Sequence, residues 1–176
     1  MKNFYIIGMP RCRSLWFAHL LTVNKVHCFH ERLSKRRLWP NPTLPKSMHY
    51  KCDVIGSADT YPSGFDAKLV GDAPVVVITR PLNDVLMSLS KNFDLPASHK
   101  AYSYIKSEHA VLNSIKTDNM MTVDFSELNC VYKIREICDF IGVTLSLPHI
   151  RRYVNSKITV DNKQVMMSKH AFLDNI

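Results

Sequence analysis

Long apolar runs and paired cysteines are missing from this sequence of 176 residues. No run approaches the roughly 18 apolar residues of a membrane span, and the stretch before Gly8 is too short for a signal peptide. The five cysteines are an odd set without a CxxC pair or zinc-like spacing, which favours reduced thiols over a disulfide framework or a structural metal. We therefore expect a soluble, cytoplasmic protein that binds neither a membrane nor a metal ion.

Acidic residues are also few, because 15 Asp and Glu face 23 Lys and Arg and leave a formal net charge of +8. Such an excess favours anionic partners, among them phosphate, sulfate, nucleic acid and acidic lipid. The basic cluster "RLSKRR" at 32–37 is more typical of a solvated helix face, and no recognised nucleic-acid-binding motif accompanies it. We do not expect nucleic acid as a partner, although a noncatalytic nucleic-acid or nucleotide binder stays open as an alternative.

Short apolar runs alternate with helical patterns along the chain. Helices are predicted from Ser14 onward and at about 82–91, 98–116 and 127–141, and three prolines predict a loop at 39–46. This alternation predicts one α/β domain over 1–176, with three αβα layers around a mostly parallel sheet. Short stretches rich in β-branched and aromatic residues predict its strands, at 4–8, 26–31, 52–59, 73–80 and 120–125.

The stretch "GMPRCRSLW" at 8–16 joins the first predicted strand to the first helix. A turn that leads into a helix N-terminus exposes unpaired backbone N–H groups and attracts an anion. Arg11 and Arg13 add charge-assisted donors, and Ser14 adds a hydroxyl. The alternative is an ordinary turn with solvated arginines. The nucleotide triphosphatase loop GxxxxGK[ST] does not fit, because its second glycine falls on Arg13 and its lysine on Ser14.

A second motif, "ITRPLNDVLMSLSK", occupies 78–91. Arg80 ends a predicted strand, and Ser88 lies eight residues later on the helix that follows. Pro81 suits a helix start and Asp84 favours its first turn. Because ligands of parallel sheets bind beyond the carboxyl ends of the strands, Arg80 and Ser88 are placed to bind a second anionic group. Alternatively, Arg80 pairs with Asp84 and Ser88 is an incidental surface residue.

These motifs resemble those of the sulfotransferases that use 3′-phosphoadenosine 5′-phosphosulfate (PAPS). The stretch 8–16 is similar to their 5′-phosphosulfate loop, and "RPLNDVLMS" is similar to their 3′-phosphate motif. A third segment, "VDFSELNCVYKIREICDFIGV" at 123–143, follows in the family's order, and "CFHE" at 28–31 resembles the small bacterial and phage-encoded branch. The resemblance implies a sulfotransferase of P-loop-like topology that moves a sulfuryl group from PAPS to a hydroxyl or amine acceptor and leaves adenosine 3′,5′-bisphosphate (PAP).

The resemblance also assigns roles to individual residues. Arg11 takes the place of the family's catalytic Lys or Arg. The position of "HCFHE" at the end of the strand after the first helix makes Glu31 the first candidate for the general base and His30 the second. The alternatives are a helix-capping role for Glu31 and an ordinary strand position for His30. Asp59 ends a strand at the same edge, where it contacts the acceptor or orders the site. The implied cofactor-binding residues are Pro10, Arg11, Cys12, Arg13, Ser14, Leu15, Trp16 (against the adenine), Arg80 and Ser88. For Trp16 the alternative is a core position, which is more common for an aromatic residue two residues into a helix.

The sequence departs from the family at two places. Cys12 stands where serine is usual, and beside arginines at a helix N-terminus we expect an acidified thiol. No clear "RKG" segment occurs near the C-terminus, where Arg151 and Arg152 are possible substitutes. The sequence identifies neither the acceptor nor the oligomeric state, and a P-loop nucleotide or nucleoside kinase-like protein stays open as the alternative enzyme.

Overall fold

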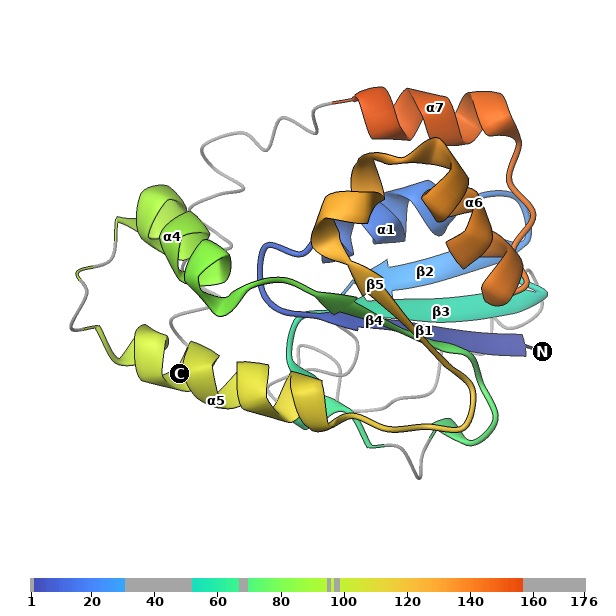
Figure 1. Ribbon diagram of the computed structural model, residues 1–176. Helices are drawn as coiled ribbons and strands as arrows, with labels where there is room; N and C mark the ends of the chain where they lie inside the picture. The colour runs from blue at the N-terminus through green and yellow to red at the C-terminus, as the bar shows by residue number, and fades with distance from the viewer. Residues whose placement is uncertain (1, 31–51, 67–69, 95, 97–98, 157–176) are drawn as a thin grey trace.

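The computed structural model describes residues 2–30, 52–66, 70–94, 96 and 99–156. Within them, five strands form one sheet in the order β2-β3-β1-β4-β5, and every neighbouring pair is parallel (Figure 1). This sheet confirms the predicted α/β fold class with a parallel core. The strands are β1 (Lys2–Gly8), β2 (Val26–His30), β3 (Val54–Asp59), β4 (Val75–Thr79) and β5 (Met120–Asp124).

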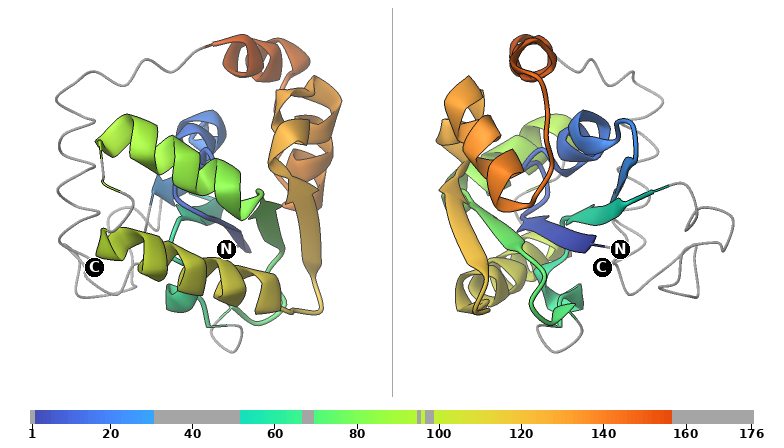
Figure 2. Two further views of the ribbon diagram at one scale, coloured as in Figure 1. Left: turned by 60° about the vertical axis from the view of Figure 1, so that its left-hand side comes forward. Right: turned by 90° about the vertical axis from the view of Figure 1, so that its right-hand side faces the viewer.

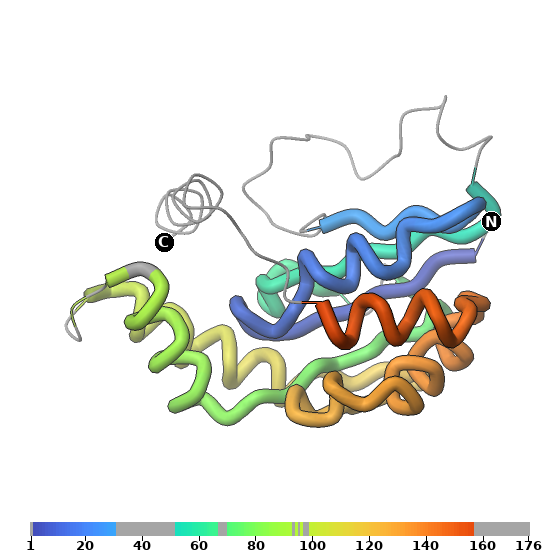
Figure 3. Tube along the Cα trace, turned by 90° about the horizontal axis from the view of Figure 1, so that it is seen from above, coloured from blue at the N-terminus to red at the C-terminus, as the bar shows by residue number. Residues whose placement is uncertain are grey.

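Helices cover both faces of the sheet and produce three layers. Helices α1 and α6 lie over one face, with α7 outside them, and α5 lies under the other face (Figures 1 and 2). Helix α4 lies beyond the end of the sheet at which β1 finishes, and α7 runs beside α1 (Figure 3). The described helices are α1 (Ser14–Leu21), α4 (Leu82–Phe93), α5 (Lys100–Ser114), α6 (Val131–Phe140) and α7 (Leu147–Asn155), with 3-10 turns η1 (Pro62–Gly64) and η2 (Phe125–Asn129).

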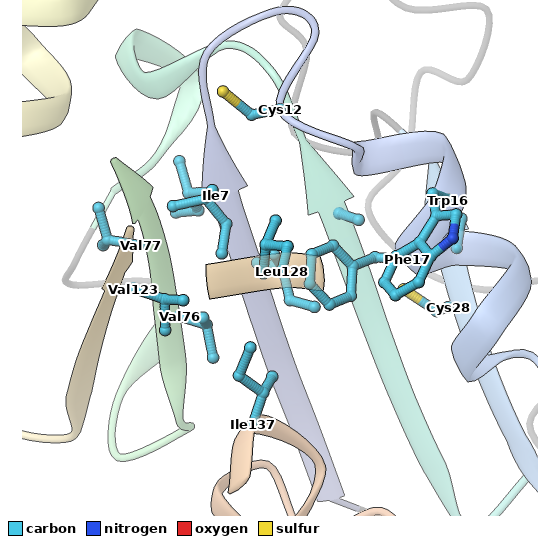
Figure 4. Close-up of a cluster of buried hydrophobic side chains, with 14 of the residues drawn as sticks. Ile7, Cys12, Trp16, Phe17, Cys28, Val76, Val77, Val123, Leu128 and Ile137 are labelled. Carbon is cyan, nitrogen blue, oxygen red and sulfur yellow. The ribbon is translucent and has the colours of Figure 1, made fainter. Parts of the chain in front are cut away.

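The centre of the sheet is apolar on both faces, as expected for a parallel sheet between helical layers. Strand β4 reads VVVIT, and its first four side chains are buried. Phe17 of α1 and Leu128 of η2 pack over the sheet near Ile7 (Figure 4). Gly56 is opposite Phe4 in the β1–β3 register, and a Cβ there would lie 2.0 Å from the Phe4 ring, so a glycine is required.

The structure corrects two predictions about the C-terminal half of the chain. The helix expected at about 127–141 is divided into η2 and α6, because Cys130 between them has an extended backbone with φ of −96° and ψ of 120°. The segment from 147 to 155, for which no helix was expected, forms α7. The sequence feature that marks the start of this helix is Ser146, whose hydroxyl accepts a hydrogen bond from the His149 N–H.

Several sequence predictions fall on residues outside the described ranges. These are the Pro-rich loop at 39–46, the basic cluster at 32–37 and the candidate base Glu31. In the described part of the chain, every helix is too short or too polar to span a lipid bilayer.

Candidate functional site

The connection from β1 to α1 has an unusual backbone. Arg11 and Arg13 both have left-handed conformations, with φ of 72° and 66°, on either side of Cys12. A non-glycine residue in this region costs on the order of 1–3 kcal/mol and persists only where surrounding contacts enforce it. Left-handed residues in a tight turn also direct successive N–H groups into a concave surface that suits an anion.

Helix α1 begins at Ser14, and its first backbone N–H groups have no acceptor within the helix. Arg13 is its N-cap residue and forms no capping hydrogen bond through its side chain. The first bond of the helix runs from the Phe17 N–H to the Arg13 carbonyl at 2.9 Å, so the N–H groups of Ser14, Leu15 and Trp16 have no acceptor within the helix. N–H groups of this kind favour an anion, and binding of an anion by this turn stays a prediction.

Cys12 lies inside this turn, and its side chain is buried (Figure 4). A Cβ on Gly8 would lie 3.0 Å from the Cys12 Cβ and 3.3 Å from the Ile78 Cβ, so the turn closes tightly against β4. Burial raises the pKa of the Cys12 thiol to about 11, and the opposing effects of the Met9 backbone hydrogen bond and the Arg80 charge are smaller. The expected acidified thiol is therefore wrong, since the side chain points into the core instead of toward solvent.

Arg13 is tied to η2. Its Nη1 donates to the Leu128 carbonyl at 2.7 Å and its Nη2 to Asn129 Oδ1 at 2.6 Å. Its guanidinium also lies 5.4 Å from the Trp16 ring centre and 5.6 Å from that of Phe125. The predicted contact of this side chain with phosphate has to compete with these bonds, so the structure assigns Arg13 an anchoring role that the sequence reading missed. No motif in the sequence indicates that Asn129 is a partner of Arg13.

Arg80 reaches from the end of β4 to the turn after β1. Its Nη1 donates to the Arg11 carbonyl at 3.0 Å, and its Cζ lies 4.3 Å from the Phe125 ring centre. Its backbone carbonyl contacts His109 Nε2 at 3.1 Å. The structure thus brings the two predicted anion-binding motifs together.

Arg11 has an exposed side chain between this turn and α4. Its Nη2 donates to Asn92 Oδ1 at 3.3 Å, and Asn92 Nδ2 donates to the Ser88 carbonyl at 2.6 Å on the same helix. Partial desolvation, with a smaller contribution from the positive charge of Arg80, lowers the pKa of Arg11. An anion bound here would favour the charged form of Arg11 and oppose both of these effects.

Among the described residues, no ion pair involves Arg11, Arg13 or Arg80. The alternative pairing of Arg80 with Asp84 therefore does not form in this structure. Asp84 lies in the first turn of α4, as predicted.

The end of β2 contacts the start of α1. His30 Nε2 lies 3.0 Å from Ser14 Oγ, which places His30 beside the helix N-terminus. Asp59, at the end of β3, is buried and accepts a hydrogen bond from the Ser57 hydroxyl. This bond joins two residues of one strand, so both predicted roles of Asp59, ordering the site and contacting the acceptor, stay predictions. Glu31 directly follows His30 and lies outside the described residues.

Trp16 is a core residue that holds α7. Its side chain is 6% exposed, its Nε1 donates to the Tyr153 carbonyl at 3.1 Å, and its ring packs edge-on against Phe17 and Tyr153. Little of the indole is left for the predicted adenine contact. Pro10 is also buried, whereas Leu15 is 36% exposed beside the helix N-terminus.

The proposed substitutes for the missing C-terminal segment, Arg151 and Arg152, are exposed on α7. Arg152 belongs to a different feature, a hollow of about 390 Å³ on the outside of α1 and α7, which does not include Arg80 or Ser88. The hollow is also lined by His19, His149, Tyr153 and Ser156. Within the described ranges, no group of three or more His, Cys, Asp or Glu side chains could hold a metal ion.

Comparisons with known proteins agree with the fold. No family model and no curated protein sequence matches this chain. The structure is similar to mouse sulfotransferase SULT7A1, crystallised with PAP, with 12% identity and a TM-score of 0.55 over 96% of this chain and 74% of that one. It is also similar to a sulfotransferase from Alicyclobacillus acidocaldarius, with 15% identity and a TM-score of 0.50 over 99% and 92% of the two chains. The chain therefore has the sulfotransferase fold.

Proposed function

We propose that this chain is a PAPS-dependent sulfotransferase, which moves a sulfuryl group from PAPS to a hydroxyl or amine acceptor and leaves PAP. The hydrogen bond from Arg80 to the Arg11 carbonyl carries the proposal, because it joins two anion-binding motifs at one edge of the sheet. PAPS has anionic groups at its 5′ and 3′ positions, which match two neighbouring cationic sites. The PAP found with SULT7A1, which shares the fold, supports the same class of ligand.

Each motif has one task in this proposal. The turn after β1 and the first N–H groups of α1 bind the 5′-phosphosulfate, and Arg80 and Ser88 bind the 3′-phosphate. In the reaction, the acceptor atom attacks sulfur, and the bond from sulfur to the bridging phosphate oxygen breaks. Arg11, whose side chain is exposed beside the turn, stabilises the charge that develops on the sulfuryl and bridging oxygens.

The acceptor must also lose a proton to a nearby base. Glu31 is our first candidate and His30 our second. The contact of His30 with Ser14 supports a base at this end of β2, because Ser14 belongs to the proposed phosphosulfate site. The proposal that this chain binds PAPS does not depend on which residue is the base, because cofactor binding needs only the arginines and the turn.

Calorimetric titration with PAP tests the proposal without a known acceptor. We expect saturable binding that is stronger than the binding of AMP or ATP, because only PAP carries both anionic groups in the required places. Replacement of Arg80 by alanine removes charge-assisted bonds to phosphate, so Arg80→Ala is expected to weaken PAP binding by about 10- to 100-fold.

Arg135→Ala is the matched control, because Arg135 is an exposed residue of α6 whose contact with Asp139 is 4.0 Å long. It removes the same charge and should leave PAP affinity unchanged. Absence of PAP binding, or equal binding of ATP, would contradict the proposal and favour the kinase-like alternative. Salt-dependent binding of oligonucleotides that PAP does not displace would favour the nucleic-acid binder.

A further inference from the structure

Phe125, the first residue of η2, contacts two arginines that come from different parts of the chain. Its ring centre lies 4.3 Å from the Cζ of Arg80, at the end of β4, and 5.6 Å from the Cζ of Arg13, in the turn before α1. Both distances are within the approximately 6 Å at which an aromatic ring attracts a guanidinium. A single ring therefore links the two motifs of the proposed site.

In the described part of the chain, the Arg80 guanidinium is oriented by one hydrogen bond and by one aromatic ring. Among the described residues, its side chain makes one hydrogen bond, from Nη1 to the Arg11 carbonyl. Its Nε is buried and has no hydrogen-bond partner there. Arg13 differs, because both of its terminal nitrogens are hydrogen-bonded to η2. The ring of Phe125 is therefore the second contact, besides the hydrogen bond to the Arg11 carbonyl, that orients the Arg80 guanidinium.

Phe125 itself is firmly held. The preceding residue, Asp124, forms a capping box with Glu127 at the start of η2. Leu128, in the same turn, is fully buried, and Phe125 packs against the core. The ring therefore has a defined position against which a flexible arginine can be oriented.

We propose that Phe125 is a positioning residue for the 3′-phosphate site, because its ring directs the guanidinium of Arg80 while Arg80 binds the ligand. This inference rests on the proposed function. It makes Phe125 a determinant of the preference for nucleotides that carry a 3′-phosphate over those that carry only a 5′-phosphate. The residue acts through Arg80 and needs no contact with the phosphate.

The binding test compares Phe125→Leu with Phe125→Tyr by titration with PAP and AMP. We expect Phe125→Leu to weaken PAP binding by about fivefold or more, which is the order of effect of a lost cation–π contact. AMP binding should stay within about twofold, because AMP has no 3′-phosphate for Arg80 to bind. Phe125→Tyr keeps the aromatic face and should restore PAP affinity. In an Arg80→Ala background, Phe125→Leu should have little further effect, since the ring acts through that arginine.

The Nε–H resonance of Arg80 gives a readout that needs no ligand. It is identified by its loss in Arg80→Lys, and it should shift in Phe125→Leu but hardly in Phe125→Tyr. An equal loss of PAP and AMP affinity in Phe125→Leu, or an unchanged resonance, would overturn the inference. If PAP binding depends on Arg80 but does not change when Phe125 is replaced, the role of Phe125 is disproved and the proposed function still stands. A wild-type protein that does not bind PAP would overturn the proposed function together with this role of Phe125.

Discussion

Two strand-to-helix connections meet at one edge of the sheet, and they are built in opposite ways. The connection from β1 to α1 contains two left-handed residues, Arg11 and Arg13. The connection from β4 to α4 contains none, and Pro81 enters the helix with a φ of −52°. The first connection therefore holds a backbone that its own residues disfavour, whereas the second follows the local preference of its sequence.

The difference shows where the stability of each connection comes from. The strained turn is held by contacts distant in sequence, above all the bonds from Arg13 to Leu128 and Asn129. The relaxed connection needs no such support, because proline and an acidic first turn already favour its geometry. Variants on the two sides should therefore differ in their effect on the free energy of unfolding.

The largest effect is expected from Arg13→Ala. It removes both hydrogen bonds to η2 and the contacts with Trp16 and Phe125, while the left-handed backbone at position 13 stays unfavourable. We expect the free energy of unfolding to fall by about 2–4 kcal/mol, because bonds that involve a charged group are worth about 1.5–3 kcal/mol and one of these is exposed. Urea unfolding at pH 7 measures the change.

Arg135→Ala serves again as the control, since its exposed ion pair on α6 should contribute less than about 1 kcal/mol. Arg13→Lys keeps the charge but not the two-pronged geometry, and should lie between wild type and Arg13→Ala. If Arg13→Ala were as stable as Arg135→Ala, the long-range support of the turn would be disproved.

A smaller effect is expected from the buried thiol of the strained turn at alkaline pH. The pKa of Cys12 is about 11 in the folded chain, whereas a free thiol ionises near 8.5. As pH rises from about 8.5 toward 11, the unfolded chain loses this proton first, so the folded state loses stability. The loss is at most about 1.4 kcal/mol per pH unit for one thiol.

Urea unfolding between pH 7.5 and 10.5 measures this loss, and Cys12→Ala should make stability fall less steeply than it does in wild type. Cys130→Ala is the control, because Cys130 is exposed and should leave the slope unchanged. Burial also raises the pKa of Cys138, to about 12, so part of the alkaline loss should persist in Cys12→Ala. Identical slopes for Cys12→Ala and wild type would show that this thiol ionises in the folded chain.

The sequence predicted the sheet well because its strands are short, apolar and continuous. Strand β4 was expected at 73–80 and occupies Val75–Thr79, and α4, expected at about 82–91, occupies Leu82–Phe93. These elements are determined by local pattern and by burial on both faces. Helix α7 was missed, because its stability depends on packing of Tyr153 against Trp16 as well as on local signals.

The binding roles of the site residues stay predictions, but part of their arrangement follows from the fold. Arg80 contacts the Arg11 carbonyl because the two motifs follow neighbouring strands, β4 and β1, and Arg11 reaches α4 through Asn92. The anchoring of Arg13 and the burial of Cys12 could not be read from the sequence. The partners of Arg13 lie 115 and 116 positions away, and no local pattern records such contacts.

The smallest effect is expected from Pro81→Ala in the relaxed connection. Proline has no N–H to lose there, and alanine can adopt the φ of −52°, so the folded state changes little. The unfolded chain gains conformational freedom, which should lower the free energy of unfolding by about 0.4–1 kcal/mol in the same urea measurement. PAP affinity should be unchanged, because Arg80 takes its direction from Phe125 and Arg11 and not from the residue that follows it. A loss as large as that of Arg13→Ala would mean that the second connection also depends on distant contacts, and the contrast between the two connections would fail.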